Sequence, residues 1–532
     1  MKRFSRRNLL AASALGAAAS ARGASRGAEQ QNSRKDLAFR VRMDAAHVQT
    51  EQPQELAVAN GDELAVPRYA AAFTKGFPHD QNGEVDPAAY RTLLHAVSTG
   101  NHADYEAVSR GSGRRFVSPQ AAHAFQLEGG DSHRFACPPP PSFSSTAGAA
   151  EMNELYWQAV CRDVPFLEYA ASPLVDQAVK SLQAIPGSVF RGPTAGDRNG
   201  PYLSQFLAKP IPSGSTIIEQ RYRTPSPGAD FVDTYPEWLQ MQTGVPPWRE
   251  PKWDPALRYI RSGRDLAEWV HYDFLYQAFL NAALIIMDHR PENVLSDRRW
   301  VLQPNNPYRR SNVQDGFVTF GFAEVVDWMG RVTTAALKAA WYQKWQVHRR
   351  LRPEEFGGRI HQTKTKVVSY PIHADVLNSS VMDVIYGRTG NYLLPQAFPE
   401  GAPLHPAYPS GHATVAGACS AVLKALFDES ALIPDCVHAS ADGLSLLPCP
   451  ASFAPTIGAE LDKLAFNVAM GRNWAGIHYR SDAEEGIKLG EDVAISVLQD
   501  LVQTFTEDFA GFEFTRAVGT RVRITPDGMA RE

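Results

Sequence analysis

The sequence has few cysteines, and their arrangement excludes several common kinds of site. Its 532 residues include five cysteines. None lies in a Cys-x-x-Cys pair, so zinc ribbons, thioredoxin-like redox centres and covalent haem attachment lack their motifs, and we expect no haem. An odd count leaves at least one thiol unpaired. Cys436 and Cys449 flank a loop containing Gly and Pro, and they can form a disulfide in an oxidising compartment.

Long hydrophobic runs and an excess of charge of one sign are also missing. No segment reaches about 18 uninterrupted apolar residues; the nearest, 278–287, is interrupted by Asn281 and fits a core helix. The formal net charge of −4 is typical neither of nucleic-acid binders nor of polybasic membrane-surface proteins. No Gly-rich dinucleotide loop or P-loop occurs. We expect an enzyme for small molecules, with no transmembrane anchor and no nucleic-acid partner.

Residues 1–24 have the composition of an export signal. A basic start containing Arg6 and Arg7 precedes a short apolar stretch, 11–21, which ends in an Ala-Ser-Ala cleavage candidate. The paired arginines resemble a twin-arginine signal and predict a protein exported to the periplasm or the extracellular space. A disordered basic tail is the alternative.

The apolar spacing of the remaining chain is mainly helical. Residues 25–65 are polar and weakly periodic and predict an N-terminal segment that is either an extended arm or a mobile leader, whereas 66–532 predict a single domain. Residues 184–258 predict a surface excursion with short helices, and 357–405 an irregular connection. Helices are predicted over 86–99, 145–169, 265–288, 322–351, 373–386, 411–427, 458–471 and 482–504, and strands over 367–370 and 520–524. The predicted fold class is mainly α, a helical bundle with long loops and few short strands.

The start of one apolar helix predicts an anion-binding site. Pro409 cannot lie inside a helix and Ser410 is a favoured N-cap residue, so a buried helix begins at Gly411. The first N–H groups of a helix lack intrahelical partners and lie at the positive end of its dipole, where anions bind. His412, in this first turn, is disfavoured as a cation unless an anion is near. Capping alone is the alternative role of Ser410.

A second segment carries cations toward the end of a predicted helix. Lys344 and Arg352 are eight residues apart, so their side chains lie within about a quarter-turn of each other. Pro353 should end the helix there. The alternative is that basic residues stabilise a helix C-terminus through its dipole, and this suffices for Arg349 and Arg350.

A third segment brings a histidine close to another cation. Arg472 lies six residues before His478, and Ser481 with Glu484 predicts a capping box just beyond it. Asp482, four residues after the histidine, can accept a proton from its ring and fix its tautomer. A purely structural histidine is the alternative.

Together the three segments predict a site for a multiply charged oxyanion. Lys344, Arg352 and Arg472 supply about three positive charges, and a charge-assisted hydrogen bond contributes roughly 1.5–3 kcal/mol. This charge suits phosphate or vanadate better than a carboxylate.

These motifs resemble those of a known superfamily. Lys…Arg-Pro, Pro-Ser-Gly-His and Arg…Gly-x-His-x-x-x-Asp, in that order, are similar to the three motifs of the vanadium-dependent haloperoxidases and acid phosphatases. The strings at 344–349, 405–413 and 476–482, and upstream at 73–80 and 154–157, resemble the vanadium bromoperoxidases of red algae and their bacterial relatives. The resemblance covers most of the mature chain, with the active site in 340–485.

The resemblance implies a cofactor and a role for each residue. Vanadate would be bound by His478, with its oxygens held by Lys344, Arg352, Ser410, Gly411, His412 and Arg472. His412 would be the acid–base group, His405 the second active-site histidine, and Lys344 would polarise the peroxide. Vanadium would stay pentavalent and act as a Lewis acid on hydrogen peroxide, which oxidises a halide to a hypohalous acid equivalent that halogenates small organic molecules. Family relatives form dimers and larger assemblies, so a homo-oligomer is implied.

One departure and one alternative accompany the resemblance. Gln343 replaces the arginine that the algal enzymes carry before the motif lysine, beside the halide route, although we still expect bromide. The alternative is an exported acid phosphatase, in which His478 forms a phosphohistidine and His412 is the general acid. Seven residues, 345–351, separate the lysine from Arg-Pro, one more than is usual in the phosphatases. The peroxidase is therefore favoured, and a non-enzymatic oxyanion carrier is the least favoured interpretation.

Overall fold

The computed structural model describes residues 21–188, 190, 202–288 and 301–531, and the chain divides into two compact units, Met1–Gln52 and Pro53–Glu532. Most of the predicted signal segment lies outside the described residues. In the first unit, helix α1 spans Ala21–Glu51. The prediction of an extended arm is therefore wrong for this stretch. Residues 28–52 contain neither Gly nor Pro, and the helix ends just before Pro53.

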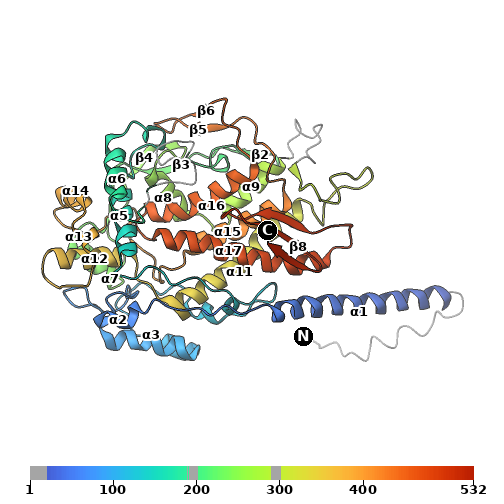
Figure 1. Cartoon of the computed structure of the whole chain (residues 1–532), viewed down its shortest axis with the longest axis horizontal. Coiled ribbons are helices and arrows are strands. Elements are labelled where there is room, and N and C mark those ends of the chain that lie inside the picture. The colour runs from blue at the N-terminus through green and yellow to red at the C-terminus, as the bar shows by residue number, and fades with distance from the viewer. Residues whose placement is uncertain (1–20, 189, 191–201, 289–300, 532) are drawn as a thin grey trace, which may run out of the picture. The chain divides into compact units, whose positions relative to one another are not determined.

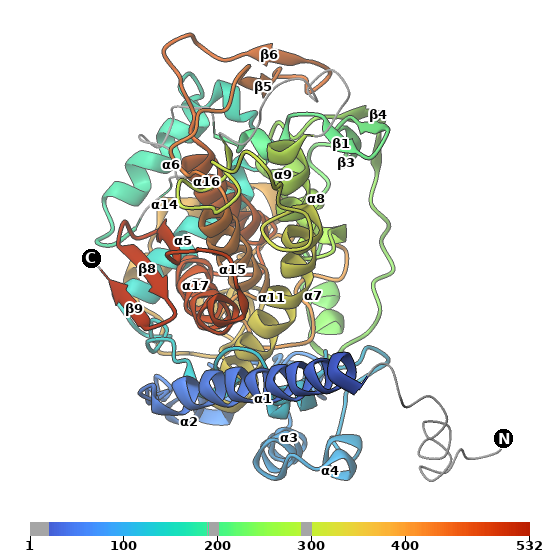
Figure 2. The same ribbon diagram turned by 90° about the vertical axis from the view of Figure 1, so that its right-hand side faces the viewer.

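The second unit is built around one buried helix, α15 (Gly411–Leu426). Every residue of α15 except His412 is buried, and α15 packs against α17 (Arg480–Leu501), α16 (Ile457–Trp474) and α11 (Phe322–Tyr342) (Figures 1 and 2). Helix α8 (Gly263–Tyr272) packs on α16, while α5 (Thr146–Cys161) contacts the same helix. The predicted mainly α bundle is confirmed. None of the helices in the described ranges is long and apolar enough to cross a membrane.

Shorter elements surround this bundle. Over the described residues, the other α-helices are α2 (Asp62–Ala65), α3 (Pro87–Thr99), α4 (His102–Glu106), α6 (Pro173–Gln183), α7 (Tyr235–Gln242), α9 (Gln277–Met287), α12 (Pro353–Lys364), α13 (Ala374–Leu377) and α14 (Ser380–Thr389). The strands form small antiparallel sheets: β1 (Ile211–Ser213) with β2 (Thr216–Ile218), β3 (Tyr222–Pro225) with β4 (Trp253–Arg258), β5 (Val437–Ala439) with β6 (Leu446–Pro448), and β7 (Phe512–Thr515) with β8 (Arg521–Thr525) and β9 (Gly528–Arg531).

Several local predictions hold and others do not. The 520–524 strand is confirmed as β8, whereas 367–370 forms no strand. The described part of 184–258 contains two antiparallel strand pairs and buried side chains such as Trp238, so it is more than a surface excursion. The structure confirms the Cys436–Cys449 disulfide, which closes the β5–β6 hairpin.

The segment 265–288, predicted as one helix, is broken into α8 and α9. Ser262, not Asp265, caps α8, because its hydroxyl accepts the N–H of Asp265. At the other end Asp273 takes an extended conformation, with φ −67° and ψ 147°. The break places the Asp273 side chain in the interior, where it is 2% exposed.

The segment 322–351, also predicted as one helix, changes character at its end. Helix α11 stops at Tyr342, and Gln343–His348 form a π-helical turn, with the Arg349 N–H donating to the carbonyl five residues back at 3.0 Å. Arg349 then has φ 38°, and Arg352 is the N-cap of α12, whose first residue is Pro353. Lys344 and Arg352 therefore lie on different elements, and 357–364, predicted to be irregular, is helical.

Close contact between α15 and α17 depends on glycine. A Cβ at Gly490 would lie 1.9 Å from the carbonyl oxygen of Thr414, and one at Gly417 would lie 2.1 Å from that of Ile487. Backbone atoms cannot yield to such contacts as a flexible side chain can. This contact sets the distance between the two helix starts, and the Ser410 N–H donates to the Asp482 carbonyl at 2.9 Å.

We expect Gly490→Ala to lower the free energy of unfolding by about 1–3 kcal/mol or more, because the added methyl forces the two helices apart. Urea or thermal unfolding measures this. Gly387→Ala is the matched control, since Gly387 lies on the exposed part of α14 with nothing within 4 Å of its Cβ position. It should be neutral or stabilising by up to about 1 kcal/mol. Equal stability of both variants would contradict the close contact.

Candidate functional site

The three predicted segments converge through hydrogen bonds of two buried cations. Lys344 Nζ donates to two consecutive carbonyls just before α15, at 2.8 Å each. Arg352 donates through Nε to the His405 carbonyl and through Nη1 to the Ile477 carbonyl, both at 2.8 Å. The side chain of the lysine and that of the arginine are fully buried. The residues that sequence spacing grouped together are therefore in contact.

Arg472 supplies the third cation from the last turns of α16. Its Nη1 donates to the Val270 carbonyl at 2.7 Å, and its guanidinium lies 5.4 Å from the centre of the Phe398 ring. Its buried Nε has no hydrogen-bond partner among the described residues. A buried donor without a partner is costly, and an acceptor bound at this point would remove the cost.

Burial makes the positive charge of this cluster expensive. It lowers the pKa of Lys344 well below its ordinary value, that of Arg352 to about 9 and that of Arg472 to about 10. Neighbouring cations lower the first two further. The hydrogen bonds of these side chains go to backbone carbonyls and imidazoles rather than to carboxylates. An oxyanion in their midst would supply the missing negative charge.

The geometry around His478 determines which ring nitrogen carries the proton. Its Nδ1 lies 2.8 Å from Asp482 Oδ2, and its Nε2 lies 3.0 Å from Arg352 Nη1. Because a guanidinium can only donate, Nε2 must be the acceptor and Nδ1 carries the hydrogen. Burial and Arg352 keep the pKa of His478 well below its usual value. The predicted Asp482 contact is present. We call the cluster of Lys344, Arg352, Arg472, His478 and the start of α15 the cage, and the lone pair of Nε2 faces into it.

His412 faces a carboxylate that the sequence did not reveal. Its Nε2 lies 2.9 Å from Asp273 Oδ1, and the other oxygen of Asp273 has no partner among the described residues. Burial lowers the pKa of His412, while the negative charge of Asp273 opposes that effect. The only sequence signal for Asp273 is a carboxylate within an otherwise apolar stretch, which does not point to His412.

The helix start has the predicted geometry. The Ser410 hydroxyl caps α15 by accepting the Ala413 N–H at 3.4 Å. Gly411 is the first residue of α15, where N–H groups have no intrahelical acceptor. At the start of α17 the predicted Ser481–Glu484 capping box is wrong: Tyr479 is the N-cap, and its N–H donates to Asp482.

Of two other predicted site residues, His405 contacts a cation of the cage and Gln343 does not. The His405 ring lies 3.0 Å from Arg352 Nη2, and burial followed by this cation keeps its pKa well below its usual value. Gln343 turns elsewhere, donating to the Phe135 carbonyl at 2.7 Å and contacting His348 at 3.2 Å. Gln343 is therefore buried outside the cage and does not take the place of a cation there.

The donor set suits an oxyanion. Cations, a helix start and an imidazole lone pair can hold an oxyanion, and Nε2 of His478 could bind its central atom. Over the described ranges, no group of three or more His, Cys, Asp and Glu side chains is arranged to hold a metal cation.

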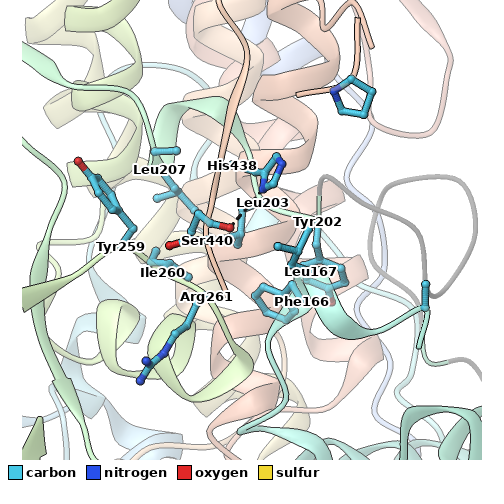
Figure 3. Close-up of a pocket in the computed structure, with 14 residues that line it drawn as sticks. Phe166, Leu167, Tyr202, Leu203, Leu207, Tyr259, Ile260, Arg261, His438 and Ser440 are labelled. Atoms are coloured by element: carbon cyan, nitrogen blue, oxygen red, sulfur yellow. Dashed lines mark hydrogen bonds between the residues drawn. The ribbon is translucent and has the colours of Figure 1, made fainter. Parts of the chain in front are cut away.

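An apolar cavity is lined by none of these residues. It has a volume of about 380 Å³ and is lined by the stacked rings of Phe166 and Tyr202 and by the β5–β6 hairpin (Figure 3). Its guanidinium, Arg261, points away from these rings and is bonded to Asp265. The cavity is therefore suited to an apolar group, and its cation, Arg261, is already paired, unlike the cations of the cage.

Comparisons with known proteins show which proteins this chain is similar to. The family model described as the VCPO second helical-bundle domain matches residues 329–507. A vanadium-dependent bromoperoxidase of Corallina officinalis is 33% identical, covering 93% of this chain and 99% of its own. One of Ascophyllum nodosum is 34% identical and covers 93% of each chain. The solved homohexameric structure of the second vanadate-dependent bromoperoxidase of A. nodosum matches with a TM-score of 0.87 and 29% identity, covering 94% of this chain and 91% of that one.

We expect inorganic phosphate to raise the thermal midpoint of the anion-free protein more than chloride of equal ionic strength does. An anion at 100 times its Kd adds about 2.7 kcal/mol to stability. Arg472→Met should weaken phosphate binding by about tenfold or more, because it removes a charge-assisted bond. The control is Arg331→Met, which removes a half-exposed arginine paired with Glu128. Equal phosphate affinity in the two variants would exclude Arg472 from the cage.

Proposed function

The chain belongs to the vanadium-dependent bromoperoxidase family, and from this premise we propose that its cage holds vanadate at His478 and uses it to oxidise bromide with hydrogen peroxide. Vanadate-dependent haloperoxidase activity follows from family membership. The choice of bromide is supported by the names of the relatives. Nothing in the comparisons favours the phosphatase alternative. We propose that the enzyme uses no haem.

The observation that carries the assignment is the unprotonated Nε2 of His478, which accepts from Arg352 Nη1 inside a cluster of buried cations. Lys344, Arg352 and Arg472 would neutralise the oxygens of vanadate, and Ser410 with the Gly411 N–H would donate to them. Bound vanadate supplies Lewis acidity toward peroxide without a change in oxidation state. Because the cations are already in place and dehydrated, little reorganisation is needed when charge develops.

Proton transfer falls to the histidines around the cage. Because the Asp273 carboxylate accepts at His412 Nε2, that nitrogen carries the hydrogen and Nδ1 can take a proton from incoming peroxide. Asp273 stabilises the imidazolium that results. His405, bonded to Arg352, is held neutral by burial and can orient a neutral ligand. Lys344, whose three donors are only partly used by the two carbonyls, can donate to a bound oxygen. Gln343 is not assigned a role in halide choice, because its side chain is committed outside the cage.

We propose further that the protein is exported and forms a homo-oligomer. The Cys436–Cys449 disulfide suits an oxidising compartment, as the twin-arginine segment does. The similar Ascophyllum structure is a homohexamer. Light scattering on the purified protein tests the assembly. Mass spectrometry of protein recovered outside the cytoplasm tests export, because it shows whether the N-terminal signal segment has been removed.

We expect the metal-free protein to brominate monochlorodimedone with hydrogen peroxide only after addition of orthovanadate. His478→Ala should abolish vanadate retention on a desalting column, because the only ligand to the central atom is removed. His412→Ala should retain vanadate while its turnover falls by about 100-fold or more, as expected for loss of an acid–base group.

The same preparations separate the alternatives. Hydrolysis of p-nitrophenyl phosphate that vanadate inhibits, without any bromination, would identify a phosphatase. Equal vanadate retention in wild type, His478→Ala and His412→Ala would contradict the assigned roles.

A further inference from the structure

Arg350 lies where the three site segments meet. The sequence allows a role at a helix end, but the π-helical turn that continues α11 ends at His348, and the Arg350 guanidinium donates to carboxylates rather than to the last carbonyls of that turn. That interpretation is therefore wrong for Arg350. Its Nη1 donates to Asp482 Oδ1 and its Nη2 to Glu151 Oε2, both at 2.7 Å. Its carbonyl accepts the Ala407 N–H at 3.0 Å. One buried residue, 5% exposed, thus contacts the segment before α15, the start of α17 and helix α5.

These contacts fix the carboxylate that orients the histidine of the cage. Asp482 Oδ2 accepts from His478 Nδ1 at 2.8 Å and from the Tyr479 N–H at 3.1 Å. The other carboxylate oxygen of Asp482, Oδ1, accepts from Arg350 Nη1. Asp482 cannot rotate about its side-chain bonds without losing a donor on one side. The orientation of the imidazole therefore depends on Arg350 as well as on Asp482.

Glu151 in turn holds the guanidinium. One of its oxygens accepts from Arg350 and the other accepts the Ser481 N–H at 2.7 Å. The Arg350 guanidinium also lies 3.8 Å from the centre of the Tyr479 ring. A planar guanidinium can serve two carboxylates and stack on a ring at once, whereas a lysine ammonium cannot.

A neighbouring ion pair also connects α5 with α17, but Arg350 differs from it because Arg350 additionally orients Asp482. One turn further along α5, Glu154 accepts from Arg480 Nε at 2.8 Å. This pair also joins α5 to the start of α17 and is equally shielded from water. The hydrogen bonds of Asp482, however, go to His478, Tyr479 and Arg350. Both Arg350 and the Glu154–Arg480 pair therefore connect α5 with the start of α17. Of the two, Arg350 alone also bonds the Asp482 side chain.

We propose that Arg350, held by Glu151, is a positioning residue that fixes Asp482 so that His478 presents its unprotonated Nε2 to vanadate. The proposal rests on the proposed function, because it assumes that vanadate is the ligand of His478. It extends the site to two residues that lie outside the three motif positions binding the oxyanion. Loss of such an outer partner typically weakens ligand affinity by 10–100-fold.

The test compares two matched pairs of variants in the metal-free protein. Arg350→Lys and Glu151→Gln break the chain to Asp482 while keeping a similar shape. Arg349→Lys is the control for the first, since Arg349 binds Glu63 instead, at 2.6 Å. Glu154→Gln is the control for the second. Orthovanadate Kd is measured by equilibrium dialysis, and the tautomer of His478 by magic-angle-spinning NMR of protein labelled with ¹⁵N-histidine, using His478→Gln to assign its signals.

We expect Arg350→Lys and Glu151→Gln to raise the vanadate Kd by about 10–100-fold and to reduce the Nδ1–H form of His478 in the metal-free protein. The two controls should stay within about threefold of wild type, with the wild-type tautomer. Unchanged Kd and tautomer in the first pair, or equal losses in all four variants, would overturn the proposal.

The NMR measurement separates this proposal from the proposed function. If the wild-type protein bound no vanadate, the function would fail, yet a tautomer change confined to Arg350→Lys and Glu151→Gln would still support positioning of His478. If vanadate bound tightly and the tautomer were the same in every variant, positioning by Arg350 would fail while the function stood.

Discussion

The structure depends on one electrostatic constraint, the burial of three cations whose own hydrogen bonds reach no carboxylate. Lys344, Arg352 and Arg472 have lost most of their hydration, and burial lowers the pKa of each. By contrast, the buried Lys75 pairs directly with Glu354 at 2.8 Å. Desolvated charge without a counter-charge is strongly destabilising. The cage is therefore best completed by a ligand that is itself an anion, and an enzyme that binds vanadate gains both cofactor and stability from the same contacts.

Irregular helix geometry builds this cage. The break between α8 and α9 turns Asp273 toward His412, and the π-helical turn at Gln343–His348 redirects the chain so that Lys344 and Arg352 converge from two elements. Regular helices through either segment would carry these side chains along one face. Such departures are frequent at functional sites because they place groups where a regular helix cannot. The long, regular helices of the bundle supply the rigidity against which the irregular turns are held.

The glycines between α15 and α17 hold the residues of the site at fixed positions. Because Gly417 and Gly490 let the two backbones touch, the anion-binding start of α15 and the segment carrying His478 are held at a short, constant separation. The Ser410 N–H bond to the Asp482 carbonyl joins the same two points. The ion pairs between α5 and α17 add a second layer behind the histidine. Precise placement of an imidazole in a cationic site thus rests on packing several residues away from it.

The sequence by itself determined the mainly helical class and the helix start at Ser410, because caps and prolines act locally. Charge spacing also indicated the buried cations that the structure places beside His405 and His478. It also indicated Asp482 as the partner of His478, four residues away. Only the tertiary structure decided that Asp273 faces His412, that Arg350 reaches Glu151 and that Gln343 turns out of the cage. These contacts join segments up to about two hundred residues apart. Local periodicity carries no information about such distances, since they are set by how the helices pack and where they break.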